Sequence, residues 1–194
     1  MELNNLNIDF ITASWFLLTL FYKTERKYTC TKDKILNLLT IVALDYACSG
    51  DKIFNEDILL NDNNEPYING LLGLSKYEYI KLPEQKDNKE YINEILDETK
   101  DNLVPFMYRC NVVDDELKEK TINVFRNFGA YPQEELGTMV SSVVNKMTTK
   151  EETLDLTKVS SVIDTIEETN DIVKYLQQKH LCNANKNNKR LIKR

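Results

Sequence analysis

The sequence predicts a mainly α-helical protein, a compact bundle of about six to seven helices. Several segments carry apolar residues at the helical spacing i, i+3, i+4, i+7. Only five glycines and four prolines occur in 194 residues, which favours long helices over many short strands. Apolar residues make up 42% of the chain and charged residues 29%, the usual balance of a globular domain with its own core.

Two helices are predicted in the first quarter of the chain. The first runs from about Asp9 to Lys23, with Asp9 as its cap. Apolar residues surround most of its circumference, so we expect it at the centre of the bundle. These residues are Phe10, Ile11, Trp15, Leu17, Leu18 and Phe21. The second helix begins near Thr31 and ends before Gly50, which suits a left-handed C-cap. Its inward face is predicted to be Ile35, Leu38, Leu39, Val42, Ala43 and Tyr46.

The middle of the chain has weaker patterns. Turn formers cluster from Asn61 to Gly73 and predict a loop. Aromatic and β-branched residues at Lys76–Leu82 and Phe106–Val113 are consistent with a minor two-stranded β element. Between these two segments, Lys89–Asn102 is predicted to be a charged helix.

The second half again has clear helical signals. Asp114 is predicted to cap a helix that ends at Gly129, with an apolar face of Leu117, Thr121, Val124, Phe125 and Phe128. Pro132 fits the first position of the next helix, which is expected to bury Leu136, Met139, Val140, Val143, Val144 and Met147. A last helical stretch, Thr157–Gln178, is expected to break near Thr169 and Asn170, where a second cap signal occurs.

Charge divides the chain into two parts, a single helical domain at 1–181 and a basic, disordered tail at 182–194. The last twelve residues hold five cations and no acid, although the whole chain has a net charge of −6. Without these cations, the rest has 20 basic and 31 acidic residues and a net charge of −11. An acidic body repels nucleic acid and attracts basic protein surfaces.

Cysteine usage and hydropathy predict a cytoplasmic protein without a membrane span. The cysteines Cys30, Cys48, Cys110 and Cys182 are far apart and show no metal-type spacing. The apolar stretch Phe10–Phe21 is shorter than the roughly 20 residues that span a bilayer. It follows acidic rather than basic residues and precedes no cleavage signal.

The residues with catalytic potential do not form a recognisable catalytic pattern, so we expect a protein that is not an enzyme and has no cofactor or metal. The single histidine, His180, is expected near the end of the last helix, where a cation has a structural explanation. No nucleotide-binding glycine motif occurs. Four acidic pairs are expected to be solvated rather than to act as acid–base pairs, and three of the four lie at or near predicted helix starts. They are Asp114–Asp115, Glu134–Glu135, Glu151–Glu152 and Glu167–Glu168.

The order of features resembles Panacea-domain proteins, the SocA-like antitoxins and phage-associated proteins. The segment from Lys34 to Ala43, KILNLLTIVA, is similar to the family's KLQKLLYFA helix, and Phe54–Ile58 follows as in its GKPLFDEEIEAW. Later, Glu119–Phe128 followed by Ala130–Leu136 is similar to the family's helix pair, and Asp171–Leu176 to its closing DIKEYF. The segment Asn63–Ile68 stands where the family reads W-x-Y-G-P-V.

This resemblance implies an antitoxin-like protein that neutralises a toxin by direct binding, or delivers it to a protease. A phage or mobile-element inhibitor of a host defence nuclease is the alternative, because the acidic body is suited to imitate nucleic acid. The candidate partner-binding residues are Tyr67, Ile68 and Leu71, apolar residues within a polar loop. They are equally compatible with anchoring that loop to the core. The basic tail is either a solubilising end or a contact for nucleic acid or an acidic membrane, although it lacks aromatic residues for base stacking.

Overall fold

The computed structural model describes residues 13–14, 16–17, 20–21, 31–51, 53, 58–60, 66–68, 114–147, 155–165 and 170–191, with residues 32, 58–60, 66–68 and 182–191 described by their backbone alone. These residues are mainly helical, which confirms the predicted fold class. The predicted helix at Lys89–Asn102 and the predicted strands at Lys76–Leu82 and Phe106–Val113 lie outside them.

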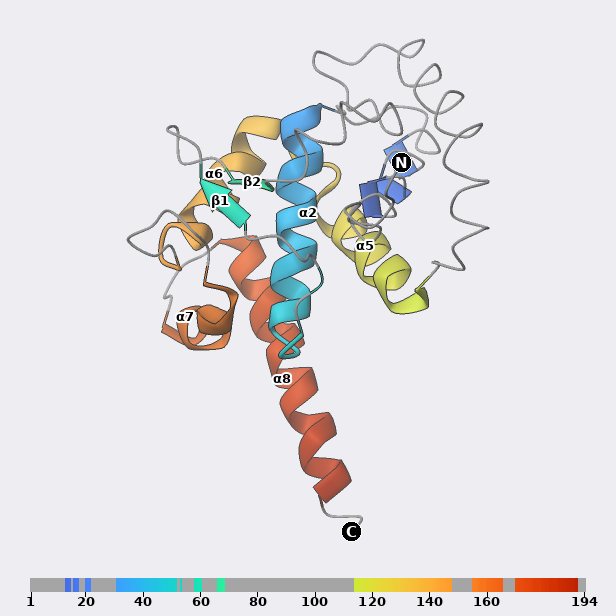
Figure 1. Cartoon of the computed structure of the whole chain (residues 1–194), viewed down its shortest axis with the longest axis vertical. Coiled ribbons are helices and arrows are strands. Elements are labelled where there is room, and N and C mark those ends of the chain that lie inside the picture. Colours follow the sequence, from blue (N-terminus) through green and yellow to red (C-terminus); the bar gives the residue numbers. More distant parts are fainter. Residues whose placement is uncertain are drawn as a thin grey trace, which may run out of the picture.

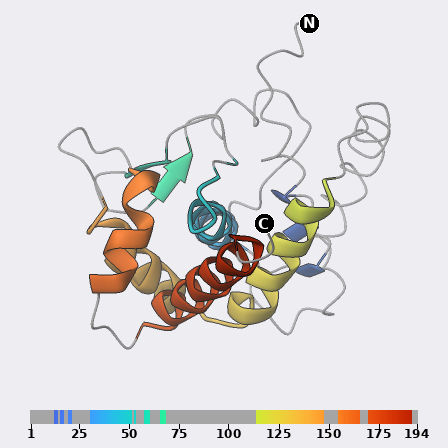
Figure 2. The same cartoon turned by 90° about the horizontal axis from the view of Figure 1, so that it is seen from below.

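Helix α2 (Lys32–Ala47) lies at the centre of the bundle. Every residue from 34 to 48 is buried. Helices α5, α6, α7 and α8 and a small hairpin surround α2 (Figure 1), and Figure 2 shows it nearly end-on in the middle of them. The central position was predicted for the first helix instead. The described part of that helix is helical, and its Phe21 ring meets the Phe125 ring of α5 edge-on, with centroids 4.9 Å apart.

Both ends of α2 are closed by the residues that the sequence singled out. The Thr31 hydroxyl accepts a hydrogen bond from the backbone N–H of Lys34 at 3.2 Å. At the other end, Gly50 has a φ of +83°, in the left-handed region. The N–H of Gly50 donates to the carbonyl of Ala47, and the N–H of Asp51 donates to that of Tyr46. This pair of bonds is a Schellman motif, which satisfies the last carbonyls of the helix.

Helices α5 (Asp115–Phe128) and α6 (Gln133–Val144) follow the predicted faces closely. Asp114 caps α5 through the N–H of Glu116 at 3.0 Å, and the five predicted inward residues are all buried. On α6 the predicted apolar residues are also buried, except that Met139 is half-buried and Met147 lies in the turn beyond the helix. Pro132 is the N-cap of α6 rather than its first residue, since its carbonyl accepts from the N–H of Leu136.

The C-terminal stretch is divided as predicted. A 3₁₀ turn (η2, Leu156–Lys158) leads into α7 (Val159–Thr165), and α8 runs from Asp171 to Leu191. The side chain of Asn170 accepts from the N–H of Ile172 and so caps α8. The same side chain donates to the Met139 carbonyl at 2.9 Å and to the Ser142 hydroxyl at 2.7 Å. Asn170 therefore starts one helix and attaches it to another.

The prediction of a disordered tail from residue 182 differs from the structure, because α8 continues to Leu191. Figure 1 shows this part of α8 projecting beyond the other elements. The segment contains no glycine or proline and includes Ala, Lys, Arg and Leu, which are good helix formers. Its polarity indicates that it does not join the core, but it does not prevent a helix.

A short antiparallel hairpin overlaps the segment predicted to be a loop, with its second strand inside that segment and its first strand just before it. Strands β1 (Ile58–Leu60) and β2 (Pro66–Ile68) pair with Leu59 opposite Tyr67. The turn formers of residues 61–64 connect the two strands, which is why the sequence pattern suggested irregular structure. Proline at the first position of a strand removes no necessary donor.

Candidate functional site

The most unusual feature of the core is a carboxylate near the C-terminal end of α2. Asp45 is 1% exposed and lies between the buried residues Leu44 and Tyr46. A negative charge at this end of a helix is opposed by the helix macrodipole, and removing it from water costs free energy. Asp45 therefore requires partners from neighbouring elements.

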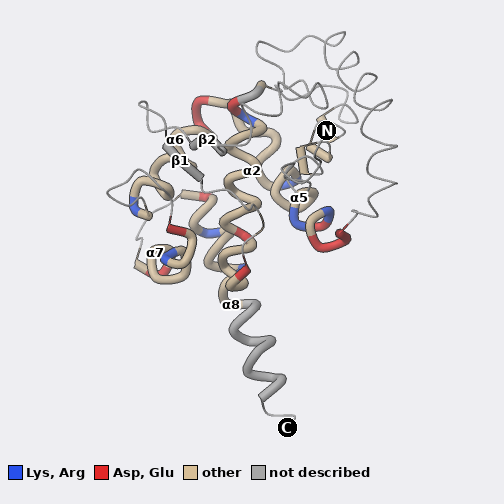
Figure 3. Tube along the Cα trace, viewed as in Figure 1, with Lys and Arg blue, Asp and Glu red and all other residues tan. Residues whose placement is uncertain are grey.

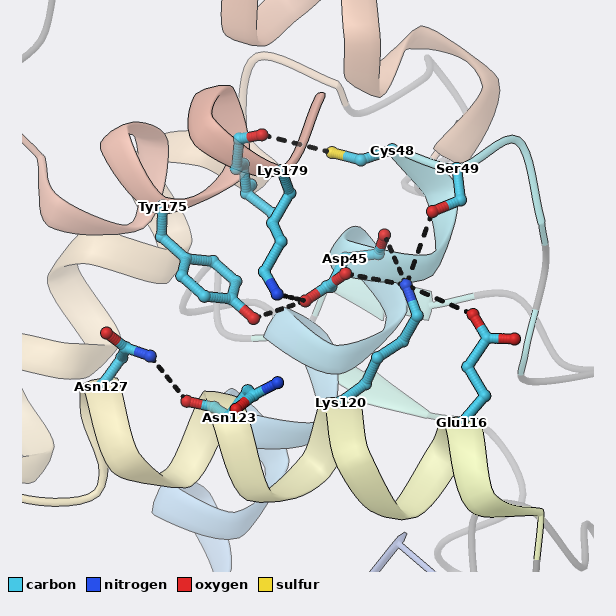
Figure 4. Close-up of polar contacts among 10 residues, drawn as sticks. Asp45, Cys48, Ser49, Glu116, Lys120, Asn123, Asn127, Tyr175 and Lys179 are labelled. Carbon is cyan, nitrogen blue, oxygen red and sulfur yellow. Dashed lines mark hydrogen bonds and ion pairs between the residues drawn. The ribbon is translucent and has the colours of Figure 1, made fainter. Parts of the chain in front are cut away.

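Three side chains from two other helices supply those partners (Figure 4). The ammonium group of Lys120, on α5, lies 2.8 Å from Asp45 Oδ1. From α8, the Tyr175 hydroxyl donates to Oδ2, and the Lys179 Nζ lies 4.0 Å from the same oxygen. We call Asp45, Lys120, Tyr175 and Lys179 the Asp45 cluster. It ties α2, α5 and α8 together at one point.

Lys120 also contacts residues outside the Asp45 cluster. Its Nζ lies 3.5 Å from the Ser49 hydroxyl and 3.7 Å from Glu116 Oε1, which is exposed. The same ammonium group lies over the Tyr46 ring, 4.4 Å from its centroid. The Lys120 side chain is 12% exposed. A cation held by two acids and a ring face keeps its position, since each contact favours the same rotamer.

Burial also alters the acidity of two neutral groups beside Asp45. Burial raises the pKa of the Cys48 thiol to about 12, and the charge of Asp45 adds to this effect. Burial raises the pKa of Tyr175 as well, with further contributions from the charge of Asp45 and from the hydrogen bond to it. Both groups therefore stay protonated near neutral pH. A protonated thiol is a poor nucleophile, so Cys48 is an unreactive neighbour of the Asp45 cluster.

His180 has a different environment from the predicted one. It lies within α8 rather than at its end, and it faces α7. Its Nδ1 is 3.4 Å from the Ser160 hydroxyl, and its Nε2 is 3.9 Å from Asp164 Oδ2. Ser, His and Asp are the residue types of a hydrolytic triad. Here both distances exceed the 2.6–3.2 Å of a working pair, and Asp164 is exposed. These residues form polar contacts that join α7 to α8.

The described acidic pairs lie where the sequence placed them. Asp114 and Asp115 are exposed at the start of α5, and Glu134 and Glu135 are exposed at the start of α6. The pairs at 151–152 and 167–168 lie outside the described residues. Adjacent residues on a helix diverge by about 100°, so each described pair extends over the surface.

The candidate partner-binding residues are only partly covered by the structure. Tyr67 and Ile68 belong to β2, and the backbone of this strand lies beside α2 and α6. Leu71 lies outside the described residues. The position of β2 against two core helices is what the anchoring interpretation expects, and the binding interpretation stays a prediction.

Within the described part of the chain, no group of three or more His, Cys, Asp or Glu side chains is arranged to hold a metal ion. The described helices include none with the length and apolar character that a bilayer span requires.

Sequence reasoning missed the Asp45 cluster. A signal was present, because Asp45 is the only charged residue in the run from Ile35 to Ser49. The partners Lys120, Tyr175 and Lys179 lie 75 to 134 positions later, and nothing in their local sequence points to Asp45. Comparisons with family models, with curated proteins and with solved structures find no significant match to this chain.

Proposed function

We propose that this chain is an antitoxin-like protein that neutralises a partner protein by direct binding, through sequestration of a toxin or its delivery to a protease. The observation that supports this proposal best is the position of its exposed acids. They gather at helix starts that the fold holds in place (Figure 3). Such a surface suits a basic protein partner, because complementary charge steers association and orients the complex.

The first acidic surface is the edge where α2 and α6 begin. Asp33, Glu134 and Glu135 are exposed there. The side chain of Gln133 joins the two helix starts: its Oε1 accepts from the Thr31 hydroxyl at 2.5 Å, and its Nε2 donates to Asp33 Oδ2 at 3.0 Å. We call Asp33, Glu134 and Glu135 the α2–α6 edge. Its acids are attached to two cross-linked helices.

The second acidic surface is the start of α5. Asp114, Asp115, Glu116 and Glu119 are exposed there, with Lys118 as a single exposed cation among them. Asp114 is held by its capping bond. We call these four acids the α5 edge. Because the two edges lie on different helices, a partner that uses one of them does not require the other.

A rigid acidic surface favours affinity for a simple reason. Side chains that are already ordered lose less conformational entropy when a partner binds. The resemblance to Panacea-domain antitoxins supports the same class of function, since that work depends on shape and surface charge.

The test is co-expression with the protein encoded by the neighbouring open reading frame. We expect rescue of growth and co-purification. Two variants with equal charge change locate the surface: Asp33→Asn/Glu134→Gln/Glu135→Gln at the α2–α6 edge, and Asp115→Asn/Glu116→Gln/Glu119→Gln at the α5 edge. One of them should lose most of the binding while the other keeps it. Equal losses would show that net charge alone acts, and absence of both rescue and co-purification would contradict the proposal.

The alternative function is inhibition of a host defence nuclease through its nucleic-acid cleft. The exposed carboxylates at the two edges favour it, because closely spaced negative charges on a helix resemble a row of phosphates. Binding by mimicry should weaken strongly between 50 and 500 mM salt and should compete with duplex DNA. A salt-independent affinity would argue against it.

The candidate residues Tyr67, Ile68 and Leu71 have a separate test, replacement of all three by Ser. If they contact the partner, binding falls while thermal unfolding stays near that of the wild type. A stability loss of roughly 3 kcal/mol or more would identify them as loop anchors.

A further inference from the structure

Helix α8 has two parts with different surroundings. In its first part, Ile172, Val173, Tyr175 and Leu176 are buried. Leu181 is 62% exposed and marks the point where the helix leaves the body. Ten further residues are helical up to Leu191, which adds about 15 Å at 1.5 Å per residue. We call residues 182–191 the α8 extension.

The charges of the α8 extension are all of one sign and share a helical spacing. Lys186, Lys189 and Arg190 are related by steps of three and four residues, so they belong to the same face of an α-helix. The same repeat leads back to Lys179 and forward to Lys193. The only acid in α8 is Asp171, at its first position. The extension is therefore a basic helix with its cations along one stripe.

Because the extension projects from the body, the repulsion between the acidic body and a polyanion is weaker there. Residues 1–181 carry a net charge of −11, which would repel a polyanion held against them. The Debye length at physiological ionic strength is about 8 Å. Lys186 and Arg190 are five and nine residues beyond Leu181, about 7 and 13 Å along the helix axis. Arg190 lies more than one Debye length beyond Leu181, so a polyanion held there meets less repulsion than one held against the body.

We propose that the α8 extension binds duplex DNA. An α-helix about 10–12 Å in diameter fits the major groove, which is about 12 Å wide. The cations of the stripe would contact phosphates, and the four asparagines of the extension (Asn183, Asn185, Asn187 and Asn188) are of the side-chain type that pairs with adenine edges.

Other anionic ligands fit the extension less well. Residues 182–194 include no aromatic residue on which single-stranded bases stack. The major groove of duplex RNA is too deep and narrow for a helix. Between residues 183 and 190 only Ala184 is apolar, whereas a helix that lies in a membrane surface needs a continuous apolar face.

The experiment measures the fluorescence anisotropy of a labelled 20-base-pair DNA duplex with the full chain. We expect binding at 50 mM salt with a slope of log K against log salt of about −3, since the three cations of the α8 extension contact phosphates. This slope corresponds to a loss of about 40-fold in affinity at 200 mM salt. Replacement of Lys186, Lys189 and Arg190 by Gln should weaken binding by at least about 30-fold and reduce the slope to near zero.

Two further variants distinguish an effect of the extension itself from an effect of the net charge of the chain. The matched control replaces Lys118, Arg126 and Lys146 by Gln; these cations are exposed on the body, and we expect binding near that of the wild type. Ala184→Pro keeps every charge but interrupts the helix. It should weaken DNA binding severalfold while the thermal unfolding of the body stays unchanged.

Four results would overturn the proposal. They are absence of binding at 50 mM salt, equal losses in the extension variant and in its matched control, stronger binding to phosphatidylserine vesicles than to DNA, and an extension that serves only to associate two copies of the chain. The last is measured by light scattering of the wild type and of a chain that ends at Leu181.

Discussion

The hydroxyl of Tyr175 on α8 donates a hydrogen bond to the carboxylate of Asp45 on α2, across 130 residues of sequence. The ring of Tyr175 also meets the Phe128 ring of α5 edge-on, with centroids 5.4 Å apart. The other oxygen of Asp45 is held by Lys120 of α5. One tyrosine therefore connects three helices, through its hydroxyl on one side and its ring on the other.

We predict that Tyr175→Phe lowers the free energy of unfolding by about 2 kcal/mol, because the buried Asp45 carboxylate loses a donor while the ring packing is kept. Urea denaturation measures the change. Tyr131→Phe is the matched control, since the Tyr131 hydroxyl donates to Asp171, a carboxylate that water reaches. The control should have a clearly smaller effect. Equal losses would mean that burial of the acceptor does not matter.

The ion pair between Lys120 and Asp45 should have a larger effect. We predict that Lys120→Met costs about 3 kcal/mol, because it leaves a buried charge without its main partner. The double variant with Asp45→Asn should lose less than the sum of the two single changes, since it removes the unpaired charge. Lys158→Met breaks an exposed pair with Asp155 and should have no measurable effect. An additive double variant would contradict a direct interaction.

The thiol of Cys48 should be unreactive in the folded protein. With the other three cysteines replaced by Ser, we expect Cys48 to react with a thiol reagent at pH 8 on the order of 1000-fold more slowly than in urea. The raised pKa reduces the thiolate fraction by about this factor, and burial slows the reaction further. Similar rates in buffer and in urea would show that the Cys48 site opens readily.

The same shift predicts a loss of stability at alkaline pH. The unfolded thiol loses its proton near its ordinary pKa of 9.0, whereas the folded thiol keeps it to about pH 12. Above pH 9 the unfolded state therefore binds fewer protons, and stability falls as pH rises, by up to about 1.4 kcal/mol per pH unit. Denaturation curves at pH 8 to 10 measure this slope. Cys48→Ala should remove most of the slope between pH 9 and 10, and an unchanged slope would assign it to other groups.

Two glycines should respond to alanine with opposite signs. Gly50→Ala should destabilise by about 1 kcal/mol, because φ is +83° and an L-residue is strained there even though the new Cβ has open space. Gly137→Ala should stabilise by about 0.5–1 kcal/mol. Gly137 lies within α6, and its added Cβ would be 3.6 Å from Asn37 Nδ2, an ordinary contact. Thermal melts of both variants measure the difference, and shifts of the same sign would contradict the conformational argument.

Local patterns predicted the helices well where the cause of a helix end is local. Asp114 and the Asn170 region were predicted as caps, Thr31 as the start of a helix and Gly50 as a left-handed terminator, because each acts on backbone groups a few residues away. The apolar face of α5 was predicted residue by residue, since periodicity reports the buried side of a helix. The same reasoning was wrong for the α8 extension, where polarity was interpreted as disorder.

The sequence by itself determined which segments become helices, where most of them begin and end, and that the body is acidic while the C-terminal end is basic. These properties depend on neighbouring residues and on composition, so they can be read without a fold. Only the tertiary structure decided that α2 is central, that Asp45 meets Lys120, Tyr175 and Lys179, and that the basic end projects as a helix. Contacts between residues 75 to 134 positions apart depend on how the helices pack, and local sequence patterns do not predict that packing.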